Sequence, residues 1–145
     1  MPAVGIDVEG LDELRAQLRE AGGSKLTREL GKANKAGATV VADEARGRAE
    51  SLGGSAAKGA DTIKPSASAK ASSVNLGGAR APWMAGAEFG ALAFAQFPDW
   101  KGNQWSPDSG NVGYFLHPAI RDTKDEFLEV YGDAIDDLMA RAFPD

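Results

Sequence analysis

The sequence of 145 residues contains no cysteine and only one histidine, His117. Without cysteine the chain can form no disulfide, no thiolate zinc site and no cysteine nucleophile. A Ser-His-Asp triad or a histidine-ligated metal would have to use His117, which lies beside Pro118 in an apolar segment. That setting is typical of a structural or surface histidine, so we expect no enzymatic activity, no metal and no cofactor.

Long apolar runs and positive charge are also scarce. No stretch of about 18 apolar residues occurs, which predicts no membrane-spanning helix. Residues 1–4 lack the basic and apolar segments of a signal peptide, so we expect the cytoplasm of the cell that makes the chain. The formal charge of -5 and the pI of about 4.9 disfavour a DNA-binding module, but they suit a protein that DNA passes without binding.

Large apolar side chains are modest in number, because alanine supplies many of the residues counted as hydrophobic. A chain of this length is expected to form one domain, residues 1–145, and to bury about two thirds of its unfolded surface. We therefore expect a thin core that gains part of its stability from partner subunits.

The N-terminal part of the chain shows a strand pattern and then helix patterns. Residues 4–8 alternate apolar and polar positions, which predicts a short half-buried strand. Leucines at helical spacing predict a helix that ends at Gly22-Gly23, and a longer helix is predicted over residues 24–51. The apolar stripe of the longer helix consists mainly of small residues: Leu26, Leu30, Ala33, Gly37, Val40 or Val41, Ala45, Ala49 and Leu52. Such a stripe lets another backbone approach closely.

Small residues dominate the next segment. Residues 53–60 contain mostly glycine, alanine and serine, which predicts a flexible loop. Residues 63–69 and 71–76 then predict two weak strands that form a hairpin. Pro65 cannot donate a backbone hydrogen bond, so it places the first of these strands at a sheet edge or at its own start.

Aromatic residues gather in the segment that follows. Residues 81–97 include Trp83 and form either a strand or a short helix, because their periodicity does not decide between the two. A polar loop is predicted over residues 98–111, and it carries Trp100 and Trp105. These tryptophans either fold back on the core or dock into a partner, and a carbohydrate platform is the rarer alternative.

The C-terminal part predicts one long amphipathic helix that starts near Pro118. Its apolar stripe contains Ile120, Phe127, Tyr131, Ile135, Leu138 and Ala142. Its opposite side, the acidic face, contains Asp122, Asp125, Glu126, Glu129, Asp133, Asp136 and Asp137. Asp133 and Asp137 lie one turn apart and could bind a cation, but a solvated acidic face is far more common.

Charge is segregated between the two long helices. Residues 25–48 carry six basic and three acidic residues, so the earlier helix is mildly positive. It would either touch phosphates or, more commonly, form salt bridges with an acidic neighbour. The acidic face of the last helix in a neighbouring subunit is a candidate partner for it.

Two short motifs occur in a characteristic order. Glu88-Phe89-Gly90 precedes the variable loop, and Phe115-Leu116 with Pro118-Ala119 opens the last helix, with Ile120 in place of a leucine. This order resembles the head-to-tail joining and tail-completion proteins of long-tailed double-stranded DNA bacteriophages. The resemblance implies an α+β fold, in which a small, mostly antiparallel sheet packs against two long helices. It also implies a structural protein of the virion, assembled in the bacterial host cytoplasm.

In such proteins the subunits form a homo-oligomeric ring, expected to hold about six copies, between the capsid connector and the tail tube. The ring contacts other neck and tail proteins and leaves a channel for DNA. Two alternatives stay open: a tail terminator that stops tail-tube growth, and a small DNA-binding or DNA-processing protein.

The candidate contact residues follow from these patterns. Glu88 is expected to accept backbone N–H groups or to pair with a base, Phe89 to serve as a buried anchor, and Gly90 to adopt a positive φ or to allow close backbone approach. The alternative is that Phe89-Gly90 is simply a strand end with a turn. The acidic face is expected either to line the channel or to form a subunit interface. The candidate subunit or partner contacts are Lys32, Lys35, Trp83, Glu88, Phe89, Gly90, Trp100, Trp105, Phe115 and Leu116.

Overall fold

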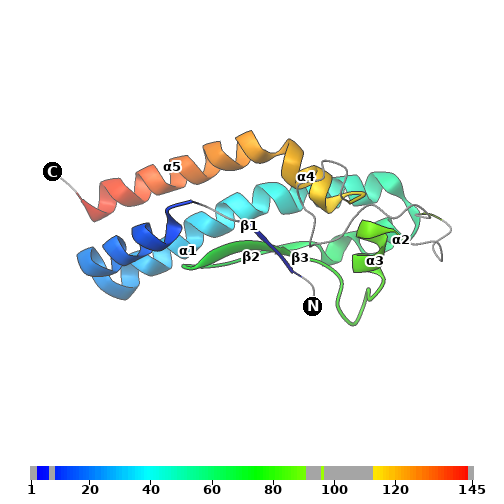
Figure 1. Ribbon diagram of the computed structural model, residues 1–145, viewed down its shortest axis with the longest axis horizontal. Coiled ribbons are helices and arrows are strands. Elements are labelled where there is room, and N and C mark those ends of the chain that lie inside the picture. Colours follow the sequence, from blue (N-terminus) through cyan, green and yellow to red (C-terminus); the bar gives the residue numbers. More distant parts are fainter. Residues whose placement is uncertain (1–2, 7–8, 91–95, 97–112, 144–145) are drawn as a thin grey trace.

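An antiparallel sheet and a long helix packed against it form the centre of the molecule (Figure 1). The computed structural model describes residues 3–6, 9–90, 96 and 113–143. Within these residues the sheet has three strands in the order β1-β3-β2, namely β1 (Ala3–Ile6), β3 (Ala71–Asn75) and β2 (Lys64–Ser68). Helix α1 (Leu11–Leu52) lies against the sheet, and helix α5 (Lys124–Ala142) packs on α1. The α+β class with two long helices is therefore confirmed.

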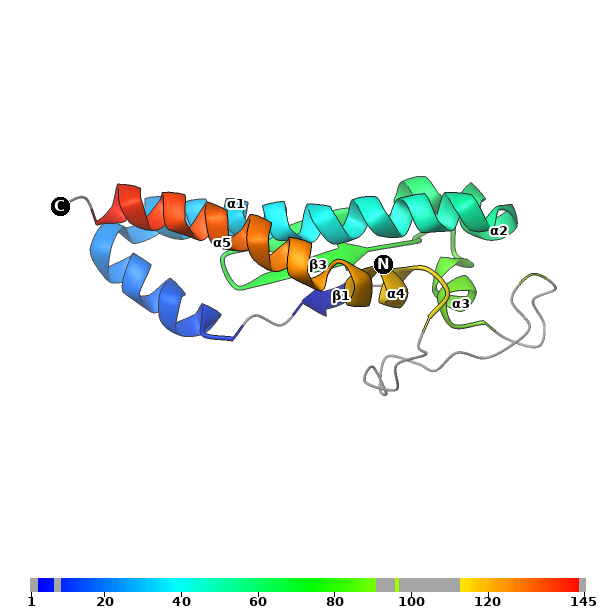
Figure 2. The ribbon, with the colours of Figure 1, turned by 90° about the horizontal axis from the view of Figure 1, so that it is seen from above.

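Helix α1 consists of two helical segments joined at a sharp bend. Gly23 interrupts the helix with φ 63 and ψ -142, a conformation that glycine adopts without steric cost. The first segment folds back at an angle to the second, so that the two form a V-shaped helical hairpin (Figure 2). Leu18 and Leu30 are fully buried within this hairpin, where they pack with Leu138 of α5. The predicted helix end at Gly22-Gly23 is confirmed.

The small residues of α1 allow α5 to approach closely. Gly37 is buried, and a Cβ atom added to it would collide with the ring of Phe127 on α5. Most of the predicted stripe is buried, but Leu26 and Val40 are half-buried and Leu52 is 41% exposed. The aromatic rings of Phe127 and Tyr131 stack with centroids 5.7 Å apart, so the two long helices meet through rings set against small side chains.

The prediction of a flexible loop over residues 53–60 is wrong. This segment forms helix α2 (Gly54–Lys58) and the start of a 3-10 helix, η1 (Ala60–Thr62). Gly53 and Gly54 have φ values of 73 and 56, which turn the chain directly into α2, and Ala56 is fully buried. Small side chains here permit tight packing and do not leave the backbone loose.

The predicted hairpin is confirmed, with Pro65 on the edge strand β2. Its turn is fixed to α1 by Asn34, whose side-chain amide donates to the Ser68 carbonyl at 2.7 Å. The Ser72 hydroxyl donates to the Asn34 carbonyl at 2.8 Å. These bonds hold the small-residue ribbon on the helix, where apolar burial alone would be weak.

Residues 81–97 contain a short helix, α3 (Met84–Phe89). It is attached to α2 by Trp83, the residue that precedes α3. The indole N–H of Trp83 donates to the Ser55 carbonyl in α2 at 2.8 Å. The predicted loop over residues 98–111 lies outside the described residues.

The last helix is divided in two, contrary to the prediction of one continuous helix. Helix α4 (Leu116–Asp122) ends at Thr123, and α5 begins at Lys124. The Thr123 hydroxyl donates to the Ala119 carbonyl at 2.6 Å, and such bonds back to the preceding turn bend helices. Pro118 lies in the first turn of α4, where a missing N–H costs nothing. The predicted apolar stripe faces inward, with Phe127, Tyr131 and Leu138 buried and Ile120, Ile135 and Ala142 half-buried.

We expect Gly37→Ala to lower the free energy of unfolding by about 1–3 kcal/mol, because the new methyl group meets the Phe127 ring in a packed interface. Urea unfolding followed by far-UV circular dichroism measures the change. Gly47→Ala on the same helix is the matched control, since a Cβ there meets nothing within 4 Å. The control should be unchanged or more stable by up to about 1 kcal/mol. Equal stability of Gly37→Ala and the wild type would contradict this packing.

Candidate functional site

The buried carboxylate of Glu88 holds the start of α4. Its Oε1 accepts the backbone N–H groups of Tyr114, Phe115 and Leu116 at 3.0, 2.9 and 3.0 Å. Its Oε2 accepts the backbone N–H of His117 at 2.6 Å and lies 2.5 Å from the Nδ1 of the same residue. The first N–H groups of a helix have no partner within the helix and carry partial positive charge, so a carboxylate suits this position. We call this arrangement the Glu88 clamp.

The clamp joins the two motifs, which lie far apart in the sequence. Glu88 ends α3, and its carbonyl also accepts the Tyr114 N–H at 2.9 Å. The Phe89 ring packs on the His117 ring with centroids 5.5 Å apart. Gly113 has φ 82, and a Cβ there would collide with the Glu88 carboxylate, so the approach requires glycine. The expectation that Glu88 accepts backbone N–H groups is confirmed.

Gly90 confirms a second expectation, since it has φ 80 and ends α3 by donating its N–H to the Gly86 carbonyl at 2.6 Å. Its positive φ turns the chain away at the end of the Glu-Phe-Gly motif.

His117 has a structural role. It is 8% exposed, and both oxygens of the facing carboxylate are occupied by backbone N–H groups and the imidazole. A carboxylate used in this way stabilises a helix start.

Among the described residues there is no cluster of three His, Cys, Asp or Glu side chains suited to a metal ion. None of the described helices is both long and apolar enough to cross a membrane.

Several predicted contact residues prove to be interior residues. Phe115 and Leu116 are fully buried and Glu88 is 1% exposed, so the prediction that they contact a partner is wrong. Their side chains pack or bond inside the subunit, where no neighbour reaches them. Gly90 is also buried, and Phe89 is half-buried. Trp83 is half-buried against the main core, while Trp100 and Trp105 lie outside the described residues.

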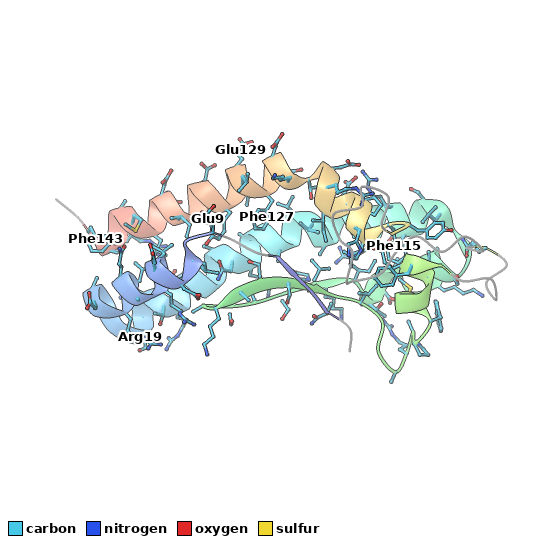
Figure 3. All side chains as sticks on the ribbon, viewed as in Figure 1. Glu9, Arg19, Phe115, Phe127, Glu129 and Phe143 are labelled. Carbon is cyan, nitrogen blue, oxygen red and sulfur yellow. The ribbon has the colours of Figure 1, made fainter. Side chains whose placement is uncertain are left out.

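The acidic face lies on the outer side of the molecule. All seven of its carboxylates are exposed, and Figure 3 shows Glu129 pointing away from α1. Asp122 bonds to Arg48 of α1 at 2.6 Å, and Arg48 also bonds to Glu44 at 3.0 Å. Burial lowers the pKa of Arg48, but the hydrogen bonds to the two carboxylates outweigh it and raise that pKa above its usual value.

Some of the opposite charges on the two long helical regions thus form ion pairs within the chain. At the other end of α5, Arg141 lies 3.4 Å from Glu29 of α1. Glu29 also pairs with Lys32 at 3.1 Å, and the hydrogen bond from Lys32 holds the pKa of Glu29 below its usual range. Lys35 is exposed and has no ion-pair partner among the described residues. Lys32 and Lys35 are both exposed, and their contact with a partner stays a prediction.

A shallow groove, the basic groove, runs between α1 and the turn that joins β2 to β3. Its volume is about 440 Å³. It is lined by Ser24, Thr27, Arg28, Gly31, Lys32 and Lys35 of α1, and by Ala67, Ser68 and Ala69 of the hairpin. The sequence alone did not reveal this groove, because it depends on a hairpin about 35 residues away being held against the helix by Asn34.

Comparison of the chain with protein-family models, with characterised proteins and with solved structures finds no match. The assignment of function therefore depends on the residues and their geometry.

We expect Glu88→Gln to lower the free energy of unfolding by about 2–4 kcal/mol, because the amide places a donor against buried backbone N–H groups. Chemical denaturation measures this loss. Glu126→Gln removes the same charge from the exposed face of α5 and should change stability by no more than about 0.5 kcal/mol. Similar small effects for both variants would show that the clamp is not a stabilising interaction.

Proposed function

We propose that this protein is a structural subunit of the neck or tail end of a long-tailed double-stranded DNA bacteriophage. In this proposal its copies assemble into a ring that joins the capsid connector to the tail tube. The observation that carries the proposal is the Glu88 clamp, in which the Glu-Phe-Gly motif binds the first turn of the helix opened by the Phe-Leu-x-Pro-Ala motif. The two motifs on which the resemblance depends thus form one physical joint.

The joint suits a ring subunit. In a closed ring each copy uses two different surfaces, and an angular error at one contact is repeated at every contact. The clamp fixes the start of α4 to α3, and the ion pair between Arg48 and Asp122 fixes its end to α1. The outward face of α5 is therefore held at a set orientation relative to the rest of the subunit.

The charge distribution suits passage of DNA. A net charge of -5 repels phosphates, which would keep a genome from adhering to the ring. A tail terminator would use the same physical properties and differ only in its partner.

Light scattering coupled to size-exclusion chromatography, together with negative-stain microscopy, tests the proposal. We expect a ring, which for six copies of 15.1 kDa has a mass of about 91 kDa. Assembly that requires the connector or tail tube of the same phage would also support it. A chain that stays monomeric with both structures present, or that binds duplex DNA in a salt-sensitive manner, would refute it.

A further inference from the structure

The outward side of α5 carries a regular stripe with an unusual composition. Its members follow helical spacing of three and four residues: Asp125, Leu128, Glu129, Gly132, Asp133 and Asp136. Its acidic members are exposed, and Leu128 is 52% exposed, which makes it one of the few large apolar side chains on the surface of the described residues. The α5 stripe thus offers one exposed apolar side chain surrounded by carboxylates.

Gly132 is the member of this α5 stripe that packing within the chain does not explain. Glycine weakens a helix interior relative to alanine, yet a Cβ at this position would meet nothing within 4 Å. The position is open space, one helical turn from Leu128. The absence of a side chain there allows the backbone of another molecule to approach closely.

The basic groove has matching dimensions and opposite charge. Its α1 members, from Ser24 to Lys35, follow the same spacing as the α5 stripe and span the same eleven residue steps, about 16 Å. Arg28, Lys32 and Lys35 supply its cations, and Ala67 and Ala69 supply small apolar surface. Arg28 and Lys35 have no ion-pair partner among the described residues. The groove therefore offers cations to carboxylates and an apolar patch to a leucine.

The two surfaces cannot meet within one molecule. The buried residues Phe127, Tyr131 and Leu138 turn α5 toward α1, so its stripe faces outward. The groove lies where the hairpin meets α1, and Figure 1 shows the hairpin and α5 on opposite sides of that helix. A contact between different surfaces on two copies is heterologous, and repetition of such a contact produces a ring or a filament.

We propose that the basic groove of one copy receives the α5 stripe of a second copy of this chain. The contact would pair Lys32 and Lys35 with carboxylates such as Glu129 and Asp133, and would set Leu128 against the small residues of the groove. The biological meaning of this contact rests on the proposed function, since it is the repeating interface of the ring.

A charge-reversal experiment tests the contact. The groove variant is Lys32→Glu with Lys35→Glu, and the stripe variant is Glu129→Lys with Asp133→Lys. Each variant alone brings like charges together, so we expect self-association measured by sedimentation velocity to weaken about tenfold or more. An equimolar mixture restores opposite charges at every contact and should recover assembly. Such recovery also shows that both variants are folded.

Two controls separate the contact from general effects of charge and surface. Lys58→Glu with Lys64→Glu makes the same change in net charge as the groove variant, but at exposed positions outside the groove. This control should leave association unchanged. Gly132→Gln places a side chain in the open space on the α5 stripe and should weaken association, whereas Gly47→Gln fills an equally open site on α1 and should not.

The outcomes distinguish this inference from the proposed function. A ring that forms normally in both charge-reversal variants would overturn the groove contact and leave the proposed function standing. Filaments or dimers that depend on the groove, without a ring, would support the contact and refute the neck role. Binding of duplex DNA that the groove variant abolishes, with self-association unchanged, would overturn the contact and assign the groove to phosphates. A wild-type chain that stays monomeric up to about 1 mM overturns the contact as well.

Discussion

The placement of one buried side chain, Glu88, determines how the C-terminal part of this molecule attaches to the rest. A buried carboxylate is costly unless its oxygens are satisfied, and here the backbone N–H groups of four consecutive residues and an imidazole satisfy them. The same bonds satisfy the N–H groups that a helix start leaves without partners. Helix α4 therefore begins where the carboxylate lies, and the direction of α5 follows from it.

The sequence predicted those features that local chemistry decides. The glycine pair at Gly22-Gly23 indicated the bend in α1, and Pro65 indicated an edge strand, because each residue restricts its own backbone. Features that depend on distant partners were predicted less well. The segment from Gly53 was interpreted as flexible because its residues are small, and only the fold shows that Ala56 is fully buried. The bend at Thr123 depends on a single hydroxyl, which no periodicity reveals.

The residues of the candidate site show the same difference between features set by local sequence and features set by distant partners. Glu88 was expected to accept backbone N–H groups or to pair with a base, and the choice depends on a segment 26 to 29 residues away. Phe115 and Leu116 have the composition of contact residues, but core and contact residues share that composition. The exposure of the acidic face was predicted correctly, because residue spacing alone shows which residues share one side of an amphipathic helix. The basic groove requires two elements to meet and was not predicted.

The bend at Gly23 has a consequence for the order in which the chain becomes a finished subunit. It brings Leu11 and Leu18 into one apolar cluster with Leu30 and Leu138, residues that come from opposite ends of the sequence. During synthesis the leucines of α1 leave the ribosome long before Leu138 does, so this apolar cluster stays incomplete until α5 has emerged. A nascent chain without α5 therefore lacks one side of this apolar cluster.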